Sequence, residues 1–286
     1  MKVVLAGAYG HLGSDILRSL VKAGHSVIAA DAMERDLGLE GDITFRSIDV
    51  TNPSTLEGLC DGADIVITTV GLTKASSKVT NYDIDYHGNL NLLKEAQKAG
   101  VQRFIYISVV KADQKGTEKI PMVHAKYLME QDLIHSGMPY MIYRPTGYFY
   151  DIVHVFKPMI EKGEVSLLGK KPVSANVIDT PDFADYIVSH LADGGKIVSI
   201  GGQETYTYEE IARMCFKAAG KEPVIKYAPE FLFDVLAFVN HCKKNGKEAI
   251  IRFSQWTLTE PMIGDTKAGT HSFAKYIEDS FQGDAE

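Results

Sequence analysis

The sequence predicts an α/β fold built on a doubly wound parallel sheet, with a small C-terminal substrate lobe. Two observations carry this prediction. Through about residue 150, short runs rich in Val and Ile alternate with helical patterns, as in a parallel sheet that is covered on both faces. In addition, a glycine-rich turn joins the first predicted strand to the first predicted helix.

The elements follow in order along the chain. Strands of buried, β-branched composition are predicted at residues 3–7, 26–30, 43–50, 64–70, 103–110 and 140–145. Helices with apolar residues at helical spacing, or with a Pro after a capping residue, are predicted at 11–23, 53–60, 82–99 and 121–136. We therefore predict a dinucleotide-binding domain over residues 1–150.

After residue 150 the pattern changes to shorter strands, at 165–169, 196–202 and 223–229, separated by helices at 180–191, 207–219 and 229–244. We predict that residues 151–286 form mainly a substrate-binding lobe, with some elements returning to the main sheet. The apolar run FLFDVLAFV at 231–239 is interrupted by Asp234 and is expected to form a core or pocket helix.

Composition limits the classes of function. The chain has 286 residues, 45% hydrophobic content and a net charge of −7, which argues against nucleic-acid binding that rests on bulk charge. The three cysteines, Cys60, Cys215 and Cys242, have no metal-like spacing and read as reduced thiols, so no metal site is predicted. With no leader pattern and no apolar run near the ~18 residues of a membrane span, we expect a cytoplasmic protein without a membrane span.

The glycine-rich turn GAYGHLG is the first candidate site. Gly7 permits the tight turn out of the strand, Gly10 lets the backbone approach a pyrophosphate, and Gly13 lets helix and strand pack closely. Because the motif lies between the first strand and the first helix, we predict dinucleotide binding by this loop. The residues between the glycines, which include Tyr9, His11 and Leu12, are expected to line the cofactor.

The ends of the next strands should complete the adenosine half of the site. Asp31 lies 18 residues after Gly13, where a carboxylate binds the ribose hydroxyls and repels a 2′-phosphate, so NAD is favoured. The nearby Arg35 keeps NADP as the alternative. Further cofactor contacts are expected at the ends of strands three and four, from Asp49, Val50, Val70 and Gly71.

With these pieces located, the chain resembles the atypical, extended-type short-chain dehydrogenase/reductases, and within them the divinyl chlorophyllide 8-vinyl reductase-like and NmrA-like group. The segments that carry the resemblance are GAYGHLG, DYHGNLNLLKEAQKAGVQRFIYIS, HAKYLMEQDL and YRPTGYF. The resemblance covers most of the chain. It implies a Rossmann fold that binds NAD(P) and a nicotinamide-dependent activity.

The resemblance also implies residue roles. Ser108 matches the catalytic Ser, Lys126 matches the Lys that holds the nicotinamide ribose, and Pro145 and Thr146 match the segment that lies against the nicotinamide. The family's Tyr general acid would fall at Met122 and is missing here. Each residue also has a purely structural interpretation. Ser108 could merely end a strand, and Lys126 could form a surface ion pair with Glu130, four residues further along the same helix.

Another side chain would then have to supply the proton, and Tyr148 is the first candidate, with His124 and Tyr127 as alternatives. The expected function is that of an NAD(P)-dependent oxidoreductase acting on a small or medium-sized organic substrate. Two alternatives stay open, an NmrA-like non-catalytic redox regulator and a sugar-nucleotide epimerase or dehydratase. The chain is expected to be a monomer or a homodimer.

Overall fold

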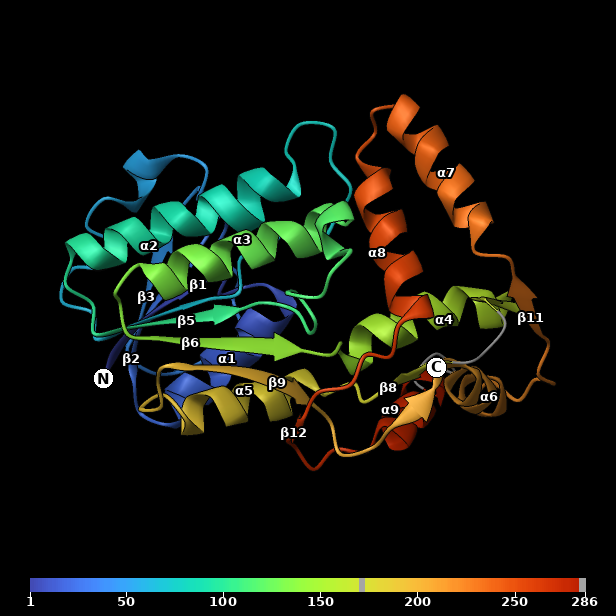
Figure 1. Ribbon diagram of the computed structural model, residues 1–286. Helices are drawn as coiled ribbons and strands as arrows, with labels where there is room; N and C mark the ends of the chain where they lie inside the picture. Colours follow the sequence, from blue (N-terminus) through green and yellow to red (C-terminus); the bar gives the residue numbers. More distant parts are fainter. Residues whose placement is uncertain (170–172, 283–286) are drawn as a thin grey trace. The chain divides into compact units, whose positions relative to one another are not determined.

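The structure is a computed structural model that describes residues 1–169 and 173–282. The chain divides into two compact units (Figure 1). Unit 1 consists of Met1–Arg144 and Phe183–Val198, and unit 2 consists of Pro145–Asp182 and Ser199–Glu286. A short stretch from the second half of the chain therefore belongs to the unit that carries the glycine-rich loop.

A mostly parallel sheet forms the centre of unit 1, in the order β3-β2-β1-β4-β5-β6. Its strands are β1 (Lys2–Ala6), β2 (Ser26–Asp31), β3 (Ile43–Ser47), β4 (Ile65–Thr68), β5 (Arg103–Ile107) and β6 (Tyr140–Pro145). Their pairings are parallel throughout. The order continues to β9 (Lys196–Gly201) and β12 (Thr266–Lys267), which gives eight strands in all. The predicted parallel α/β fold is confirmed.

Helices cover both faces of this sheet (Figure 1). The helical segments of unit 1 are α1 (His11–Lys22), η1 (Pro53–Leu56), η2 (Tyr82–Gly88), α2 (Asn89–Lys98), η3 (Thr117–Lys119), α3 (Pro121–His135) and α5 (Thr180–Ser189). Helices α2 and α3 lie on one face, and α1 and α5 lie on the other. Leu92 and Leu133 pack with Val66 and Phe104 of the strands in one buried cluster. From β1 the strand order runs outward through β2 to β3, and it then continues from β4 on the other side of β1. Folds of this kind bind ligands at the carboxyl ends of the strands at this switch point, here β1 and β4.

The structure differs from the predicted elements in detail. The helix predicted at 53–60 is only the short 3₁₀ segment η1, because Gly58 adopts a positive φ of 68° and the chain turns there. The helix predicted at 82–99 begins instead with the π-helical segment η2. Such segments are rare and occur frequently at functional sites.

Unit 2 combines short strands with several helices. These are α4 (Phe149–Glu161), β7 (Val165–Leu168), β8 (Ser174–Ala175), β10 (Tyr206–Thr207), α6 (Tyr208–Ala218), β11 (Ile225–Ala228), α7 (Phe231–Cys242), α8 (Lys247–Thr259) and α9 (Phe273–Gln282). Strands β7 and β11 pair in parallel, and β8 and β10 pair antiparallel. The rings of Phe149 and Phe273, 4.6 Å apart, join α4 to α9 in the core of the unit.

Helix α7 corrects one expectation. The run 231–239 does form a helix, but only Ala237 and Asn240 of α7 are buried, and Phe231 is 59% exposed. The helix packs on α8 through one narrow side, so most of its apolar residues face solvent rather than a core. Among the described residues, no helix combines the length and the apolar character needed to cross a membrane.

Candidate functional site

The glycine-rich loop is held tightly between β1 and α1. The N–H of Gly7, which has a φ of 78°, donates to the carbonyl of Ala30 at 2.8 Å. A Cβ on Gly7 would lie 2.5 Å from Thr69 Oγ1, and a Cβ on Gly13 would lie 1.9 Å from the carbonyl oxygen of Gly7. These distances leave no room for side chains, as the spacing of the motif predicts.

The start of α1 is left open for an anion. Gly10 is the N-cap residue and has no side chain that could cap the helix, and the first turn of α1 contains no acidic residue. The first N–H groups of a helix lack partners within the helix and carry partial positive charge. The loop therefore fits the pyrophosphate of a dinucleotide.

Asp31, at the end of β2, supports the loop from its side. Its Oδ2 accepts the N–H of Tyr9 at 2.9 Å, and its Oδ1 accepts the N–H of Ala32 at 2.7 Å. Each carboxylate oxygen can accept a second hydrogen bond, so the group can still accept donors such as ribose hydroxyls.

A cavity of about 470 Å³ is lined by Tyr9, whose N–H binds Asp31, and by Phe45, Arg35 and the acidic Glu34 and Asp36 among others. Burial, followed by the nearby carboxylates, raises the pKa of Tyr9. The surroundings of the cavity are thus negative apart from Arg35.

The other predicted adenosine contacts lie at strand ends in unit 1. Asp49 accepts the N–H and the hydroxyl of Thr51 at 2.9 and 2.7 Å, and so caps the turn after β3. The carbonyl of Val50 accepts from Asn91 at 3.0 Å, and the carbonyl of Val70 accepts from Asn89 at 3.1 Å. The structure therefore gives these residues structural partners, and their contacts with a cofactor stay predictions.

Lys126 forms an ion pair that the sequence analysis did not anticipate. Its Nζ lies 3.1 Å from Oδ1 of Asp85, a residue in η2 that is 1% exposed. The other oxygen of Asp85 accepts the N–H of Leu72 at 3.1 Å and the amide of Asn81 at 3.0 Å. Because the carboxylate is buried and its Oδ2 accepts two hydrogen bonds, its Oδ1 is held in place facing the ammonium group.

The loop after β4 passes directly over this pair. A Cβ on Gly71 would lie 2.8 Å from Oδ1 of Asp85 and 3.3 Å from Nζ of Lys126. Only a glycine fits this position without a shift. Gly71, expected to contact the cofactor, is thus placed beside Lys126.

Ser108 lies next to the same ammonium group. Nζ of Lys126 is 3.4 Å from the carbonyl oxygen of Ile107, the residue before Ser108. The N–H of Ser108 donates to the carbonyl of Tyr143 at 2.7 Å, which ties the strand end to β6. Its hydroxyl is buried and has no hydrogen-bond partner among the described residues. A buried polar group without a partner is unusual and is available to a bound molecule.

Segment η2 explains how Asp85 reaches Lys126. Asn89 donates to the carbonyls of Ile84 and Asp85 at 3.3 and 3.0 Å and accepts the hydroxyl of Thr68 at 2.6 Å. The amide side chain thus ties η2 to the end of β4. Asp85 and Asn89 belong to the DYHGN segment that carried the family resemblance, so the sequence held a signal for them.

The alternative of a Lys126–Glu130 surface pair is wrong. Glu130 is fully buried and accepts two hydrogen bonds from Arg144, at 2.9 and 2.6 Å. The same guanidinium lies 2.9 Å from Asp113 in the loop after β5. Burial tends to lower the pKa of Arg144, but the hydrogen bonds and charges of Glu130 and Asp113 outweigh it and raise that pKa. Arg144 therefore holds α3, β6 and this loop together.

The candidate proton donors fall in different units. His124 of unit 1 shares a hydrogen bond of 3.0 Å with the hydroxyl of Tyr82, and burial raises the pKa of that phenol. Helical geometry alone would point His124 away from Lys126, yet both residues bond to η2.

Tyr148 belongs to unit 2, as do Pro145 and Thr146. Burial, followed by the charge of Asp151, raises the pKa of Tyr148. The hydroxyl of Thr146 donates to the carbonyl of Asn176 at 2.8 Å. Because Thr146 already has this structural partner, its contact with a nicotinamide stays a prediction.

Comparison with known proteins decides the family. Residues 7–194 match the model of the family described as NAD(P)H-binding. The chain belongs to this NAD(P)H-binding family. The match covers the glycine-rich loop, Asp31, Ser108 and Lys126, and NAD(P)H is therefore the cofactor class of the site.

Individual relatives support the same assignment. The chain is 26% identical over 262 residues to photosystem II assembly factor Ycf39 from a Synechocystis strain, covering 90% of this chain and 76% of the relative. It is 27% identical over 265 residues to the chloroplastic divinyl chlorophyllide a 8-vinyl-reductase of Arabidopsis thaliana, covering 82% of this chain and 61% of the relative. The expected kinship with that reductase is confirmed.

Among solved structures, the chain is similar to the NADPH-dependent quinone oxidoreductase QOR2 of Escherichia coli, solved with NADPH. The TM-score is 0.70 at 18% identity, over 98% of this chain and 99% of the other. At this identity the likeness shows the fold. It agrees with the parallel sheet and the glycine-rich loop described above.

Proposed function

We propose that this chain is an oxidoreductase that transfers a hydride between a nicotinamide cofactor and an organic substrate without a Tyr at position 122. The observation that carries the proposal is the buried Asp85–Lys126 pair beside the hydroxyl of Ser108, which no described residue hydrogen-bonds. The cofactor, when bound, donates or accepts the hydride. The ammonium, positioned by a buried carboxylate, can hold the cofactor, and the buried hydroxyl can orient the substrate.

Each residue has a distinct role in this proposal. Lys126 donates hydrogen bonds to the ribose hydroxyls of the cofactor, and Asp85 holds it in place. The hydroxyl of Ser108 donates to an oxygen of the substrate and orients it. Pro145 and Thr146 flank the nicotinamide, as the resemblance implies. Tyr148 is the proposed proton donor, and the Tyr82–His124 pair is the alternative because its hydrogen bond could relay a proton.

We also propose that NAD is preferred to NADP. The support is the carboxylate of Asp31 at the end of β2, together with Glu34 and Asp36, which with Asp31 surround Tyr9. A 2′-phosphate bound near these groups would meet three carboxylates, Asp31, Glu34 and Asp36, and one Arg, so the balance of charge disfavours it.

The experiment is an oxidation assay of NADH with purified protein and a panel of quinones, enones and aldehydes. We expect turnover with at least one acceptor, and a loss of at least about tenfold in kcat/KM for Ser108→Ala and Lys126→Met. Lys98→Met, which removes an exposed lysine from α2, is the matched control and should retain full activity. Protein that binds NADH but oxidises it with no acceptor would refute the proposal.

One observation favours a second candidate, a non-catalytic cofactor-binding regulator. Met122 stands where the family's Tyr would be, and several relatives, from Synechocystis to Guillardia theta, bear the name photosystem II assembly factor. Such a regulator should bind a protein partner with an affinity that differs between NAD⁺ and NADH. The epimerase alternative is weaker, because those enzymes need the missing Tyr as a base.

A further inference from the structure

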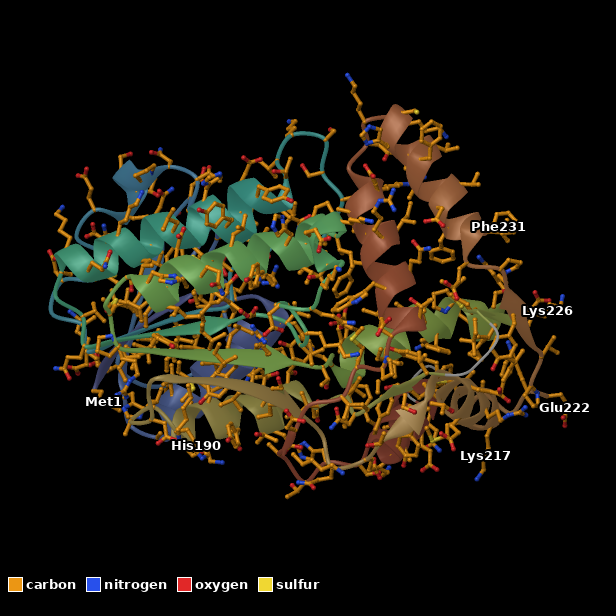
Figure 2. The ribbon with its side chains drawn as sticks, in the orientation of Figure 1. Met1, His190, Lys217, Glu222, Lys226 and Phe231 are labelled. Carbon is orange, nitrogen blue, oxygen red and sulfur yellow. The ribbon has the colours of Figure 1, made fainter. Side chains whose placement is uncertain are left out.

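Unit 2 carries a concentration of exposed apolar side chains. Of the fourteen large apolar residues exposed among the described residues, eight lie between Val224 and Val239. Six of these are on α7 and are 39% to 65% exposed: Phe231, Leu232, Val235, Leu236, Phe238 and Val239. Figure 2 shows Phe231 pointing away from the protein at the start of this helix. Contiguous patches of this kind mark interaction surfaces.

The six side chains share one side of the helix. At about 100° per residue they fall within an arc of roughly 160°, and no charged residue lies inside that arc. The opposite side, which includes the buried Ala237 and Asn240, packs on α8. We call the six exposed residues the α7 apolar face.

Asp234 and His241 lie at the edge of α7 that borders α8, whereas the exposed Cys242 in the last turn lies within the arc of the apolar side chains. Asp234 is 3.9 Å from Arg252 and accepts from Gln255 at 3.2 Å. His241 shares a hydrogen bond of 2.7 Å with Glu248. Both groups have partners on α8, so they do not interrupt the α7 apolar face.

Positive charge follows directly after the helix. Lys243 and Lys244, in the turn after α7, and Lys247, the first residue of α8, are exposed, and none forms an ion pair with a described residue. This cluster lies in a chain whose net charge is −7, so the local charge is opposite in sign to the whole. We call these three residues the lysine turn.

We propose that α7 is a membrane-surface helix. Its apolar face enters the boundary between the headgroups and the acyl chains of a bilayer, while the lysine turn contacts anionic lipid headgroups. A helix of 12 residues is roughly 18 Å long and cannot cross a hydrocarbon core of about 30 Å, so it would lie in the plane of the interface. This surface goes beyond the proposed hydride transfer and does not depend on it.

The composition of the surface favours lipid over a protein partner. The α7 apolar face contains only Phe, Leu and Val, whereas the centres of protein interfaces are enriched in Trp, Tyr and Arg. Protein interfaces are also depleted in Lys, while interfacial helices use Lys to bind anionic lipids. A second copy of the chain would have to bring two lysine turns and two identical apolar faces together.

The test is flotation of the purified chain with vesicles of phosphatidylcholine, alone or mixed with phosphatidylglycerol. We expect binding to the mixed vesicles, weakened by salt, and little binding to phosphatidylcholine alone. Substitution of Phe231, Val235 and Phe238 by Gln should abolish flotation. Lys243→Gln with Lys244→Gln should weaken it by at least about tenfold.

Matched controls separate the surface from general effects. The double variant Val155→Gln with Ile197→Gln removes exposed apolar residues elsewhere. The double variant Lys162→Gln with Lys217→Gln removes exposed lysines elsewhere. Each double variant should float with vesicles as the wild-type protein does. Thermal unfolding and NADH fluorescence show whether each variant keeps its fold. If the triple variant fails to fold, Phe231→Gln alone and the lysine pair decide the question.

Three outcomes would overturn the proposal. The first is absence of flotation with either kind of vesicle. The second is flotation that the α7 variants leave unchanged. The third is a dimer in analytical ultracentrifugation that the triple variant dissociates, without vesicle binding, since a second copy of the chain would then cover the α7 apolar face.

Discussion

At the scale of single residues, Asp31 sets the proposed choice of cofactor. Its carboxylate already supports the glycine-rich loop through Tyr9, and Glu34 and Asp36 act on the same tyrosine. The sequence alone predicted its position at the end of β2, because the glycine motif fixes where the second strand must end. It could not predict that Tyr9 would donate to the carboxylate, which depends on the path of the loop.

We expect Asp31→Ser to shift the preference toward NADPH. Removal of the carboxylate ends its repulsion of a 2′-phosphate and leaves Arg35 free to bind it, so the ratio of affinities for NADPH and NADH should rise by roughly tenfold or more. Titration of NADPH and NADH fluorescence measures both affinities. Glu40→Gln, an exposed acid of the same loop, should leave the ratio unchanged. An unchanged ratio in Asp31→Ser would show that another group selects the cofactor.

Asp85 is the residue that sequence reasoning overlooked. We expect Asp85→Asn to lower kcat/KM by at least about tenfold and to reduce the free energy of unfolding by about 1–3 kcal/mol. The loss of unfolding free energy should be smaller than for a fully buried ion pair, because the side chain of Lys126 is 15% exposed and keeps some contact with water. Urea unfolding and steady-state kinetics measure the two effects.

A matched variant tests whether the effect belongs to the site. Asp132 of α3 accepts the hydroxyl of Tyr86 in η2 at 2.8 Å, so it joins the same two elements further along the helix. Asp132→Asn makes the same chemical change there and should leave kcat/KM near the wild-type value. Equal losses of kcat/KM in the two variants would show that Asp85 has only a structural role.

The proton donor is the remaining question at this scale. If Tyr148 supplies the proton, Tyr148→Phe should lower kcat strongly while His124→Gln leaves it nearly unchanged, because the phenol is then the group that transfers it. If the Tyr82–His124 pair supplies it, the order reverses. Rates under saturating NADH, measured across pH, distinguish the two cases. Full activity in both variants would assign the proton to solvent.

At the scale of elements, the turn from β1 to α1 could be predicted almost completely. Glycines at positions 7, 10 and 13 have a known geometric purpose, and the distances in the structure confirm the crowding at the first and the third. The π-helical start of the second long helix could not be predicted, because the ties that accompany it, such as the bond between Thr68 of β4 and Asn89, join separate elements and leave no local pattern in the sequence.

We expect two glycine substitutions in the β1–α1 turn to act differently. In Gly13→Ala the new Cβ would meet the carbonyl oxygen of Gly7 at 1.9 Å, so the turn must deform and the protein should unfold at a clearly lower temperature. In Gly10→Ala the new Cβ would lie 3.3 Å from the carbonyl oxygen of Gly7, so the fold should persist while the affinity for the cofactor falls. Thermal unfolding with and without NADH measures both, and equal melting temperatures for the two variants would contradict the geometry.

The Arg144 network shows why element contacts resist prediction. Lys126 and Glu130 are four residues apart on α3, and helical spacing suggests that they pair with each other. In the structure each finds a partner on another element, Asp85 of η2 and Arg144 of β6. Burial decides the outcome, since Glu130 is fully enclosed and needs the bidentate guanidinium. Pairs across elements leave no periodic trace in the sequence.

At the scale of the whole molecule, the alternation of strands and helices sufficed to predict the parallel sheet of unit 1. The second half of the chain was harder. Helices α4, α8 and α9 were not predicted, and α4 is disguised by the Pro158 within it and by its aromatic first turn. The exposure of α7 was missed because an apolar run normally means burial, a rule that fails where a surface has a partner.

The central claim is that the Asp85–Lys126 pair and Ser108 form a working nicotinamide site rather than the remnant of one. The most direct measurement is the oxidation of NADH, deuterated at the transferred position, by the wild-type protein with a quinone or enone acceptor. We predict that the wild-type protein turns over with a primary isotope effect and that Ser108→Ala loses this turnover. Tight binding of NADH with no oxidation by any acceptor would contradict the claim.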